Sequence, residues 1–145
     1  GVWYLSDDGL NIKANLNDKY YTAPLSKMLQ NIIKLASLKG SFKYDSLAVA
    51  TLKSINNELG LLQANAPAAS IAFLMQSLSV VTIKSNEGNL REKALEIKNI
   101  DYPYVLTKMT KDDEYLACTM RRCFSRENVF EDIIKDINMD INKTY

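Results

Sequence analysis

Histidine is absent from this sequence. None of the 145 residues is histidine, the one side chain whose unperturbed pKa lies near neutrality. This absence excludes serine–histidine–aspartate triads, cysteine–histidine dyads and zinc sites with histidine ligands. Acid–base catalysis would depend on carboxylates, lysine or tyrosine with strongly shifted pKa values, and no pair of such residues stands out. We therefore expect a protein that is not an enzyme, and keep an enzyme of unidentified chemistry as an alternative.

Glycine is scarce, and neither sign of charge is in large excess. The chain has 5 glycines and no G-x-G-x-x-G or P-loop pattern, so we predict no phosphate-cradling loop and no cofactor. The 18 basic and 17 acidic residues give a net charge of +1. Domains that bind nucleic acid usually carry a larger basic excess or a dense basic stripe. Nucleic acid is therefore disfavoured as a partner.

Long apolar runs are missing as well. The longest, over residues 66–78, is interrupted by Pro67 and Ser70 and falls short of the roughly 20 residues of a transmembrane helix. We therefore predict no membrane span within the chain. Because the chain begins with Gly1 rather than methionine and shows no signal peptide, we expect a fragment of a longer or membrane-tethered chain. With 47% hydrophobic residues, residues 1–145 should form a single globular domain.

Three helices are predicted in the first half of the chain. Apolar residues recur with a helical period over residues 24–39, where Pro24 lies in the first turn and Gly40 follows the end. The same period marks residues 46–59 and residues 67–78. Each segment has the length and the cap residues of an ordinary globular helix.

A small antiparallel sheet is predicted over residues 79–109. Residues 79–84 are rich in β-branched side chains, and apolar residues alternate within residues 93–98, so these two segments should pair as a hairpin. Residues 102–109 should add a third strand. Pro103 cannot donate to a neighbouring strand, and we therefore expect this third strand at a sheet edge.

The last part of the chain contains one ambiguous segment and one clear helix. Residues 110–124 fit a helix slightly better than a strand, because a capping-box pattern opens the segment. Residues 126–141 carry a continuous helical stripe, and Ser125 is the expected cap. The predicted fold class is α+β, with N-terminal helices, a small antiparallel sheet and a C-terminal helix.

Cys118 and Cys123 are the only cysteines, and their state is tied to the local structure. In a helix their Cα atoms would lie roughly 8 Å apart, whereas a disulfide needs less than about 7 Å. Three interpretations are open: buried free thiols, a disulfide across a turn or distorted strand, and metal or redox chemistry. Two thiolates cannot complete a zinc site, so we predict no metal. A disulfide would indicate a periplasmic or secreted protein, and nothing else in the sequence indicates a localisation.

Two groups of residues are candidates for binding. Tyrosine is enriched at protein interfaces, and four tyrosines near predicted element boundaries could contact a partner or only line the core: Tyr20, Tyr21, Tyr102 and Tyr104. Three arginines near the start of the last helix could hold a phosphate or carboxylate, or form a solvated face that pairs with nearby carboxylates: Arg121, Arg122 and Arg126.

These features favour a non-catalytic domain for protein–protein interaction or assembly. Our hypothesis is the extracytoplasmic part of a pilus, secretion or membrane-tethered regulatory protein, although no motif assigns the chain to any of these. The partner would be another protein or a second copy of the chain, docking at an edge strand with free backbone groups. A nucleic-acid-binding or anion-binding domain that uses the three arginines is the alternative.

Overall fold

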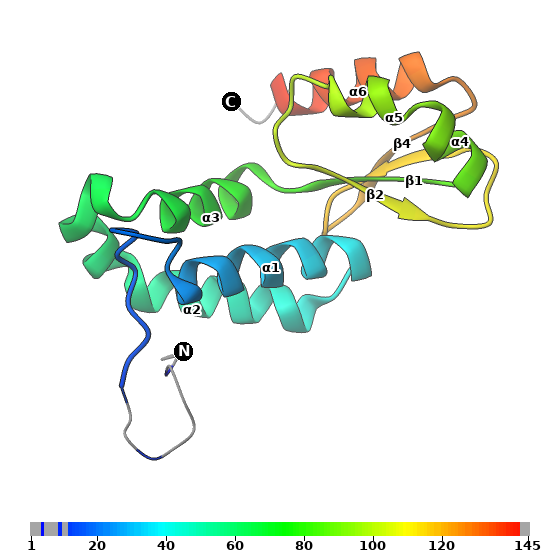
Figure 1. Cartoon of the computed structure of the whole chain (residues 1–145). Coiled ribbons are helices and arrows are strands. Elements are labelled where there is room, and N and C mark those ends of the chain that lie inside the picture. The colour runs from blue at the N-terminus through cyan, green and yellow to red at the C-terminus, as the bar shows by residue number, and fades with distance from the viewer. Residues whose placement is uncertain (1–3, 5–8, 10–11, 143–145) are drawn as a thin grey trace.

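The structure is a computed structural model that describes residue 4, residue 9 and residues 12–142. Gly1, on which the expectation of a longer chain rests, lies outside the described residues. Helices come first, followed by a four-stranded sheet with two short helices and a C-terminal helix (Figure 1). The predicted α+β class is confirmed. The elements are α1 (Pro24–Lys39), α2 (Phe42–Leu62), η1 (Gln63–Asn65), α3 (Pro67–Leu78), β1 (Val81–Ser85), α4 (Glu87–Glu92), α5 (Ala94–Lys98), β2 (Val105–Met109), β3 (Tyr115–Cys118), β4 (Cys123–Glu127) and α6 (Phe130–Asn142).

The three N-terminal helices form a bundle with α1 at its centre. α1 packs against both α2 and α3, and it buries Leu29, Ile33 and Ala36. α3 contributes Ala69 and Ala72, which are fully buried. Side chains as small as alanine let two helix backbones approach closely, and α1 and α3 accordingly share one of the most extensive contacts of the fold.

The boundaries of the bundle helices follow local capping. α1 and α3 have the bounds that the sequence predicts. Gly40 ends α1 in the left-handed conformation, with φ 60°, which glycine adopts without steric cost. α2 is longer than the predicted 46–59, because its backbone hydrogen bonding begins where the Ser41 carbonyl accepts from the Asp45 amide. No helix in the described part of the chain is long and apolar enough to cross a membrane.

One carboxylate joins the starts of α1 and α3. Asp18 Oδ1 accepts a hydrogen bond from the Ala23 amide at 2.6 Å, and Asp18 Oδ2 accepts one from the Ala68 amide at 2.8 Å. Helix N-termini leave amides without partners inside the helix and favour negative charge. Asp18 therefore caps two helices at once. Sequence patterns could not reveal this role, because α3 begins far along the chain from Asp18.

The sheet has the strand order β2-β1-β3-β4. β1 pairs with β2 in parallel and with β3 antiparallel, and β3 pairs with β4 antiparallel. The strands predicted at 79–84 and 102–109 are confirmed as β1 and β2, and β2 lies at a sheet edge as Pro103 predicts. The antiparallel arrangement predicted for residues 79–109 is wrong. Parallel neighbours need a crossover connection, which α4 and α5 provide.

The strand predicted at residues 93–98 is wrong, because this segment belongs to α5. The side-chain oxygen of Asn86 accepts from the Asn89 amide at 2.8 Å and caps α4. Most residues that follow are Glu, Arg, Lys, Leu and Ala, which lose little side-chain freedom in a helix. The alternation of Leu95 and Ile97 was a weaker signal than the helix propensity of the whole segment.

The helix preferred for residues 110–124 is also wrong, because this segment forms the β3–β4 hairpin. A disulfide joins Cys118 and Cys123 and brings their Cα atoms to 3.8 Å, which helical spacing does not allow. The sequence predicts that a disulfide between the two cysteines would place residues 118–123 in a turn or distorted strand, and this prediction is confirmed.

The C-terminal helix begins later than its predicted bounds of 126–141. α6 starts at Phe130, because Ser125 lies in β4 and does not cap the helix. Instead the Ser125 hydroxyl donates to Asp136 Oδ2 at 2.6 Å and ties β4 to α6.

The two faces of the sheet differ in character. α4 and α6 pack on one face (Figure 1), where apolar side chains form a second core. Since side chains alternate along a strand, β1 directs Val81 and Ile83 into this core and Thr82 and Lys84 to the opposite face. The end of α1 reaches that opposite face. The buried residues of the second core are Val81, Ile83, Leu90, Tyr102, Tyr115, Ala117, Phe130, Ile133 and Ile137.

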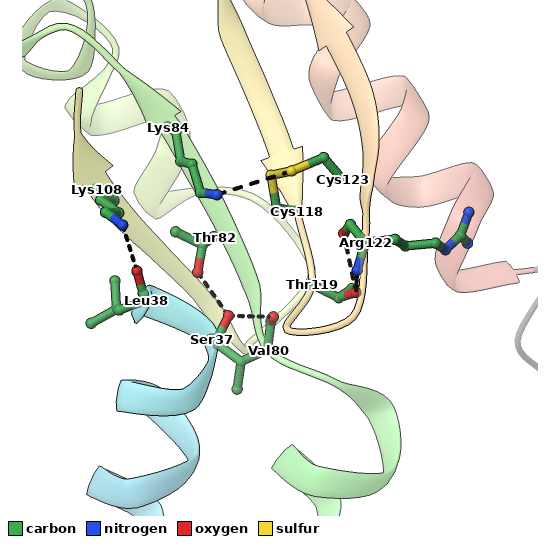
Figure 2. The surroundings of a disulfide bond; sticks show 10 residues. All are labelled: Ser37, Leu38, Val80, Thr82, Lys84, Lys108, Cys118, Thr119, Arg122 and Cys123. Atoms are coloured by element: carbon green, nitrogen blue, oxygen red, sulfur yellow. Dashed lines mark hydrogen bonds between the residues drawn. A yellow bond between two sulfur atoms is a disulfide. The ribbon is translucent and has the colours of Figure 1, made fainter. Parts of the chain in front are cut away.

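A buried hydroxyl connects the helical bundle to the sheet. The Ser37 hydroxyl in the last turns of α1 donates to the Val80 carbonyl at 2.9 Å and lies 2.8 Å from Thr82 Oγ1. Because serine has one hydroxyl proton and Val80 accepts it, the Thr82 hydroxyl donates to Ser37. Figure 2 shows this contact between the end of α1 and β1.

The turn between α3 and β1 contains a residue in a conformation that side chains avoid. Ser79 has φ 70° and ψ 150°, and no other non-glycine residue in the described part of the chain has a positive φ. The Tyr102 hydroxyl shares its single proton between the Leu78 and Ser79 carbonyls and holds this turn in place. Such a conformation costs an ordinary residue of order 1–3 kcal/mol.

Replacing Ser37 by alanine should lower the free energy of unfolding by about 1–3 kcal/mol, because the Val80 carbonyl and the Thr82 hydroxyl would lose a buried partner. Urea unfolding followed by circular dichroism measures this change. Ser46→Ala is the matched control, since Ser46 is exposed on α2 and should shift stability by less than about 0.5 kcal/mol. Equal effects of the two variants would contradict a structural role for Ser37.

Replacing Ser79 by glycine should stabilise the fold by about 1 kcal/mol. Glycine removes the conformational cost of the positive φ, and the gain is reduced by its greater freedom in the unfolded chain. Thermal and urea unfolding of the variant and of the natural sequence test this expectation. A loss of stability would show that the Ser79 side chain contributes more than its backbone costs.

Candidate functional site

The disulfide closes the short turn between β3 and β4. Cys118 ends β3 and Cys123 begins β4, and the two are paired across the hairpin. Of the three interpretations of the cysteines, the disulfide is the one confirmed, and buried free thiols are wrong. Residues 119–122 lie within the closed loop. The Thr119 amide donates to the Arg122 carbonyl at 2.8 Å and braces the loop from within.

The two cysteines differ in exposure. Cys118 is 1% exposed, because β3 lies inside the sheet, whereas Cys123 is exposed on the edge strand β4. A molecule arriving from solvent therefore meets Cys123 first. Strand order contributes to this asymmetry, since an edge strand has only one neighbouring strand to cover it.

Strand register places the bridge beside a row of positive charge. On the face that meets α1, β1 pairs Thr82 with Cys118 and Lys84 with Leu116. Lys84 also pairs with Lys108 of β2, and Leu116 pairs with Arg126 of β4. Three of the four residues across this second row, Lys108, Lys84 and Arg126, are therefore cationic. The row lies next to the row that contains the disulfide.

Lys84 extends from β1 toward the bridge. Its Nζ lies 4.0 Å from Cys123 Sγ, as Figure 2 shows. Burial lowers the pKa of the Lys84 ammonium, and the neighbouring charge of Lys108 lowers that pKa further. Within the described residues neither lysine forms an ion pair with a carboxylate. Like charges on adjacent strands are destabilising.

Lys108 is fixed by the end of α1. Its Nζ donates to the Leu38 carbonyl at 2.8 Å (Figure 2). Carbonyls at a helix C-terminus lack partners within the helix and attract positive charge. This contact holds Lys108 on the same face as Lys84 and Cys123.

Two of the three arginines predicted as an anion site are paired with carboxylates. Arg122 pairs with Asp140 at 2.5 Å, and Arg126 pairs with Glu114 at 3.5 Å. Arg121 has no carboxylate partner among the described residues. The alternative interpretation, a solvated face that pairs with nearby carboxylates, agrees with these contacts of Arg122 and Arg126.

Residues of the disulfide-closed turn line two cavities. One of about 230 Å³ is lined by Ser37, Asp45, Gln76 and Arg121, together with apolar residues of α1 and α3. The other, of about 240 Å³, is lined by residues that include Arg121, Arg122 and Asp140. Any change in the turn would alter both cavities, because its residues form a wall of each.

The four candidate tyrosines lie in three different environments. Tyr20 and Tyr21 are 83% and 70% exposed before α1. Tyr102 is buried in the second core, and its ring meets the half-buried Tyr104 edge-on, with 5.8 Å between ring centroids. The tyrosines therefore do not form one surface, and Tyr102 acts on the turn at Ser79.

The edge of β2 offers backbone groups to solvent. The Tyr104 carbonyl accepts from the Val81 amide, and the Thr110 amide donates to the Ser85 carbonyl, each at about 2.9 Å or less. In a parallel ladder alternate residues bond to the neighbour, so the backbone groups of Val105, Thr107 and Met109 point away from β1. No strand of the described chain lies beyond β2.

Sequence reasoning missed Lys84 and Lys108. Lys84 is the one charged residue of β1, which was the only signal available. A strand with both faces buried is apolar along nearly its whole length, so a lysine in such a strand indicates that one face is open to solvent at that position. Lys108 becomes the neighbour of Lys84 only through the register of β1 and β2. Residues close to either lysine in sequence do not determine that register, because a long crossover connects the two strands.

Removing the bridge by the double replacement Cys118→Ser and Cys123→Ser should lower the free energy of unfolding by only about 2 kcal/mol. The closed loop is short, and loop-closure entropy grows with loop length. The β3–β4 ladder also holds the two ends together without the bridge. Urea unfolding of the variant, with the reduced natural protein as control, measures the loss. Unfolding of either species at room temperature would show that the fold depends on the bridge.

Comparison with protein families, with curated proteins and with solved structures gives no match for this chain. The features of this chain that bear on its function are therefore the arrangement of the sheet, its bridge and its free edge.

Proposed function

We propose that this chain is a protein–protein interaction domain that receives an extended segment of another protein along β2. The free edge of β2 is the single observation that supports this function best. Edge strands carry a row of unpaired donors and acceptors, and many recognition domains bind a partner by adding a strand to such an edge. The expectation that β2 lies at an edge came from Pro103, and its position in the sheet agrees.

The β2 edge is rigidly supported, which lowers the cost of binding. β2 is bonded along its length to β1, and the Lys108 side chain anchors it to α1 through the Leu38 carbonyl. A strand that is already ordered loses little conformational entropy when a partner pairs with it. The cost of ordering then falls on the incoming segment alone.

Charge favours an acidic partner segment. Lys108 is the charged residue of β2, it lies on the face that meets α1, and it pairs with no carboxylate in the described part of the chain. Oppositely charged residues directly across two strands contribute roughly 0.2–1 kcal/mol. We therefore expect the incoming strand to carry Asp or Glu opposite Lys108.

The disulfide supports an oxidising compartment, the periplasm or the exterior of the cell, as part of this proposal. Protein isolated from its source under alkylating conditions and then weighed by mass spectrometry tests this part. A bridged pair agrees with the proposal, and two alkylated cysteines contradict it.

Replacing Thr107 by proline should abolish strand addition while leaving the sheet intact. The Thr107 amide points away from β1, so proline removes a donor from the free edge without breaking the ladder to β1. The probe is a displayed library of extended eight-residue peptides, selected on the natural protein. Enriched peptides should be rich in Asp or Glu and should bind the proline variant at least tenfold more weakly.

Thr107→Ala is the matched control, because it removes the same side chain and keeps the amide. It should bind the enriched peptides as the natural sequence does. Amide hydrogen exchange should show new protection at Val105, Thr107 and Met109 when peptide is bound. Peptides that bind both variants equally, or a library with no enrichment, would overturn strand addition at β2.

A further inference from the structure

We propose that the Cys118–Cys123 bridge is a thiol–disulfide exchange site that opens through Cys123 and reacts preferentially with thiols carrying negative charge. This inference is independent of strand addition at β2. It rests on the unequal exposure of the two cysteines, on the lysine beside them and on the backbone ladders that hold β3 and β4 in the sheet next to the bridge.

Access directs the attack to one sulfur. A thiolate must approach a disulfide sulfur directly, and only Cys123 is exposed, while Cys118 is 1% exposed within the sheet. The incoming thiolate therefore forms a bond to Cys123 Sγ, and the bond to Cys118 Sγ breaks. Cys118 leaves with the electron pair as a thiolate, and the product is a mixed disulfide on Cys123.

A second thiol completes the reduction. Its thiolate attacks the outer sulfur of the mixed disulfide and releases Cys123 as a thiolate. The two external thiols become one external disulfide, and the two electrons they lose reduce the protein bridge to two cysteines. The reverse sequence restores the bridge from an external disulfide. Each of the two steps thus consumes one external thiol as the reductant. This thiol is either a low-molecular-weight compound or a cysteine of another protein.

Lys84 stabilises the thiolates that these steps produce. Its Nζ lies 4.0 Å from Cys123 Sγ, and a neighbouring cation lowers the pKa of a cysteine thiol. Because Cys118 Sγ is bonded to Cys123 Sγ, the same ammonium also lies near the leaving sulfur. Lys84 acts on the charge of both sulfurs without entering the covalent chemistry.

The row of cations selects the incoming thiol. Lys84 and Lys108 pair across β1 and β2 without a carboxylate from the described residues, and Arg126 completes the row beside the bridge. Because Glu114 neutralises Arg126, the potential comes mainly from the two lysines, and it raises the local concentration of anions and accelerates their encounter with the site. A thiol that carries a carboxylate or sulfonate would also relieve the repulsion between the two lysines.

The fold tolerates the open state of the bridge. β3 and β4 remain joined by their backbone ladder through Tyr115, Leu116 and Ala117, and β3 remains paired with β1. Opening the bridge frees only the turn at residues 119–122. Because that turn forms a wall of two cavities, exchange changes the local surface without unfolding the domain.

The test compares three small thiols of similar size and different charge. 2-Mercaptoethanesulfonate is anionic, 2-mercaptoethanol is neutral and cysteamine is cationic. Each reduction rate is divided by the rate of the same thiol with the neutral bis(2-hydroxyethyl) disulfide, which removes differences in thiol reactivity. The anionic thiol should be favoured over the cationic thiol by at least about tenfold at low salt, and high salt should reduce this preference.

Two variants assign the preference to the cationic row. Replacing Lys84 and Lys108 together by glutamine should reduce the preference to less than about twofold, and Lys84→Gln alone should raise the alkylation pKa of Cys123 in the reduced protein. Lys53→Gln is the control, because Lys53 is exposed on α2 and should leave both quantities unchanged. Urea unfolding confirms that each variant remains folded.

Peptide mapping identifies the sulfur that is attacked. After brief treatment with 2-mercaptoethanesulfonate and acid quenching, the adduct should be on Cys123. An adduct on Cys118, or a bridge reduced more than a hundredfold more slowly than the reference disulfide by every thiol, would overturn the exchange site. A charge preference that survives the double lysine replacement would overturn the role of the row.

Discussion

The hydrogen bonds of the Ser37 hydroxyl determine how the two halves of this molecule meet. One hydroxyl at the end of α1 binds Val80, just before β1, and Thr82 within β1, so a buried polar junction joins the helical bundle to the sheet beside the apolar packing of Val80 and Leu106. A buried polar contact of this kind tolerates little displacement, because each group needs its partner. It therefore fixes α1 against one end of the sheet face and leaves the other end uncovered.

The uncovered end of that face carries the cationic side chains and the exposed cysteine of the disulfide. Thr82 is fully buried beneath α1, whereas Lys84, two residues along β1, lies beyond its cover. Register then brings Lys108, Arg126 and the exposed Cys123 onto the same open surface. The opposite face carries none of this, because α6 and the crossover helices seal it with the second core. The sheet is thus apolar and closed on one side, and cationic on the other, where the disulfide also lies.

Sequence patterns predicted those parts of the structure that local physics decides. The periodicity of α1 and α3 and the left-handed Gly40 were predictable, because each depends on residues within one or two turns. The α5 segment was misjudged because two alternating residues were weighed above the helix propensity of their neighbours. The β3–β4 hairpin was misjudged because only the bridge distinguishes it from a helix. Lys84 was missed because its neighbours, Lys108 and Cys123, are set by a parallel crossover and an antiparallel hairpin together, and no local pattern encodes that combination.

Strand order also places the sites of the two proposed activities at different parts of the sheet, on either side of β1. Strand addition would use backbone groups on the outer edge of β2, and disulfide exchange would use side chains at β1 and the opposite edge. β1 lies between them and is buried along nearly its whole length, so neither event requires the central strand to move. Lys108 is the one side chain common to both, since it lies on β2 and belongs to the cationic row. An acidic partner strand on β2 would therefore neutralise part of the potential that attracts anionic thiols, while the backbone edge and the bridge would remain physically distinct.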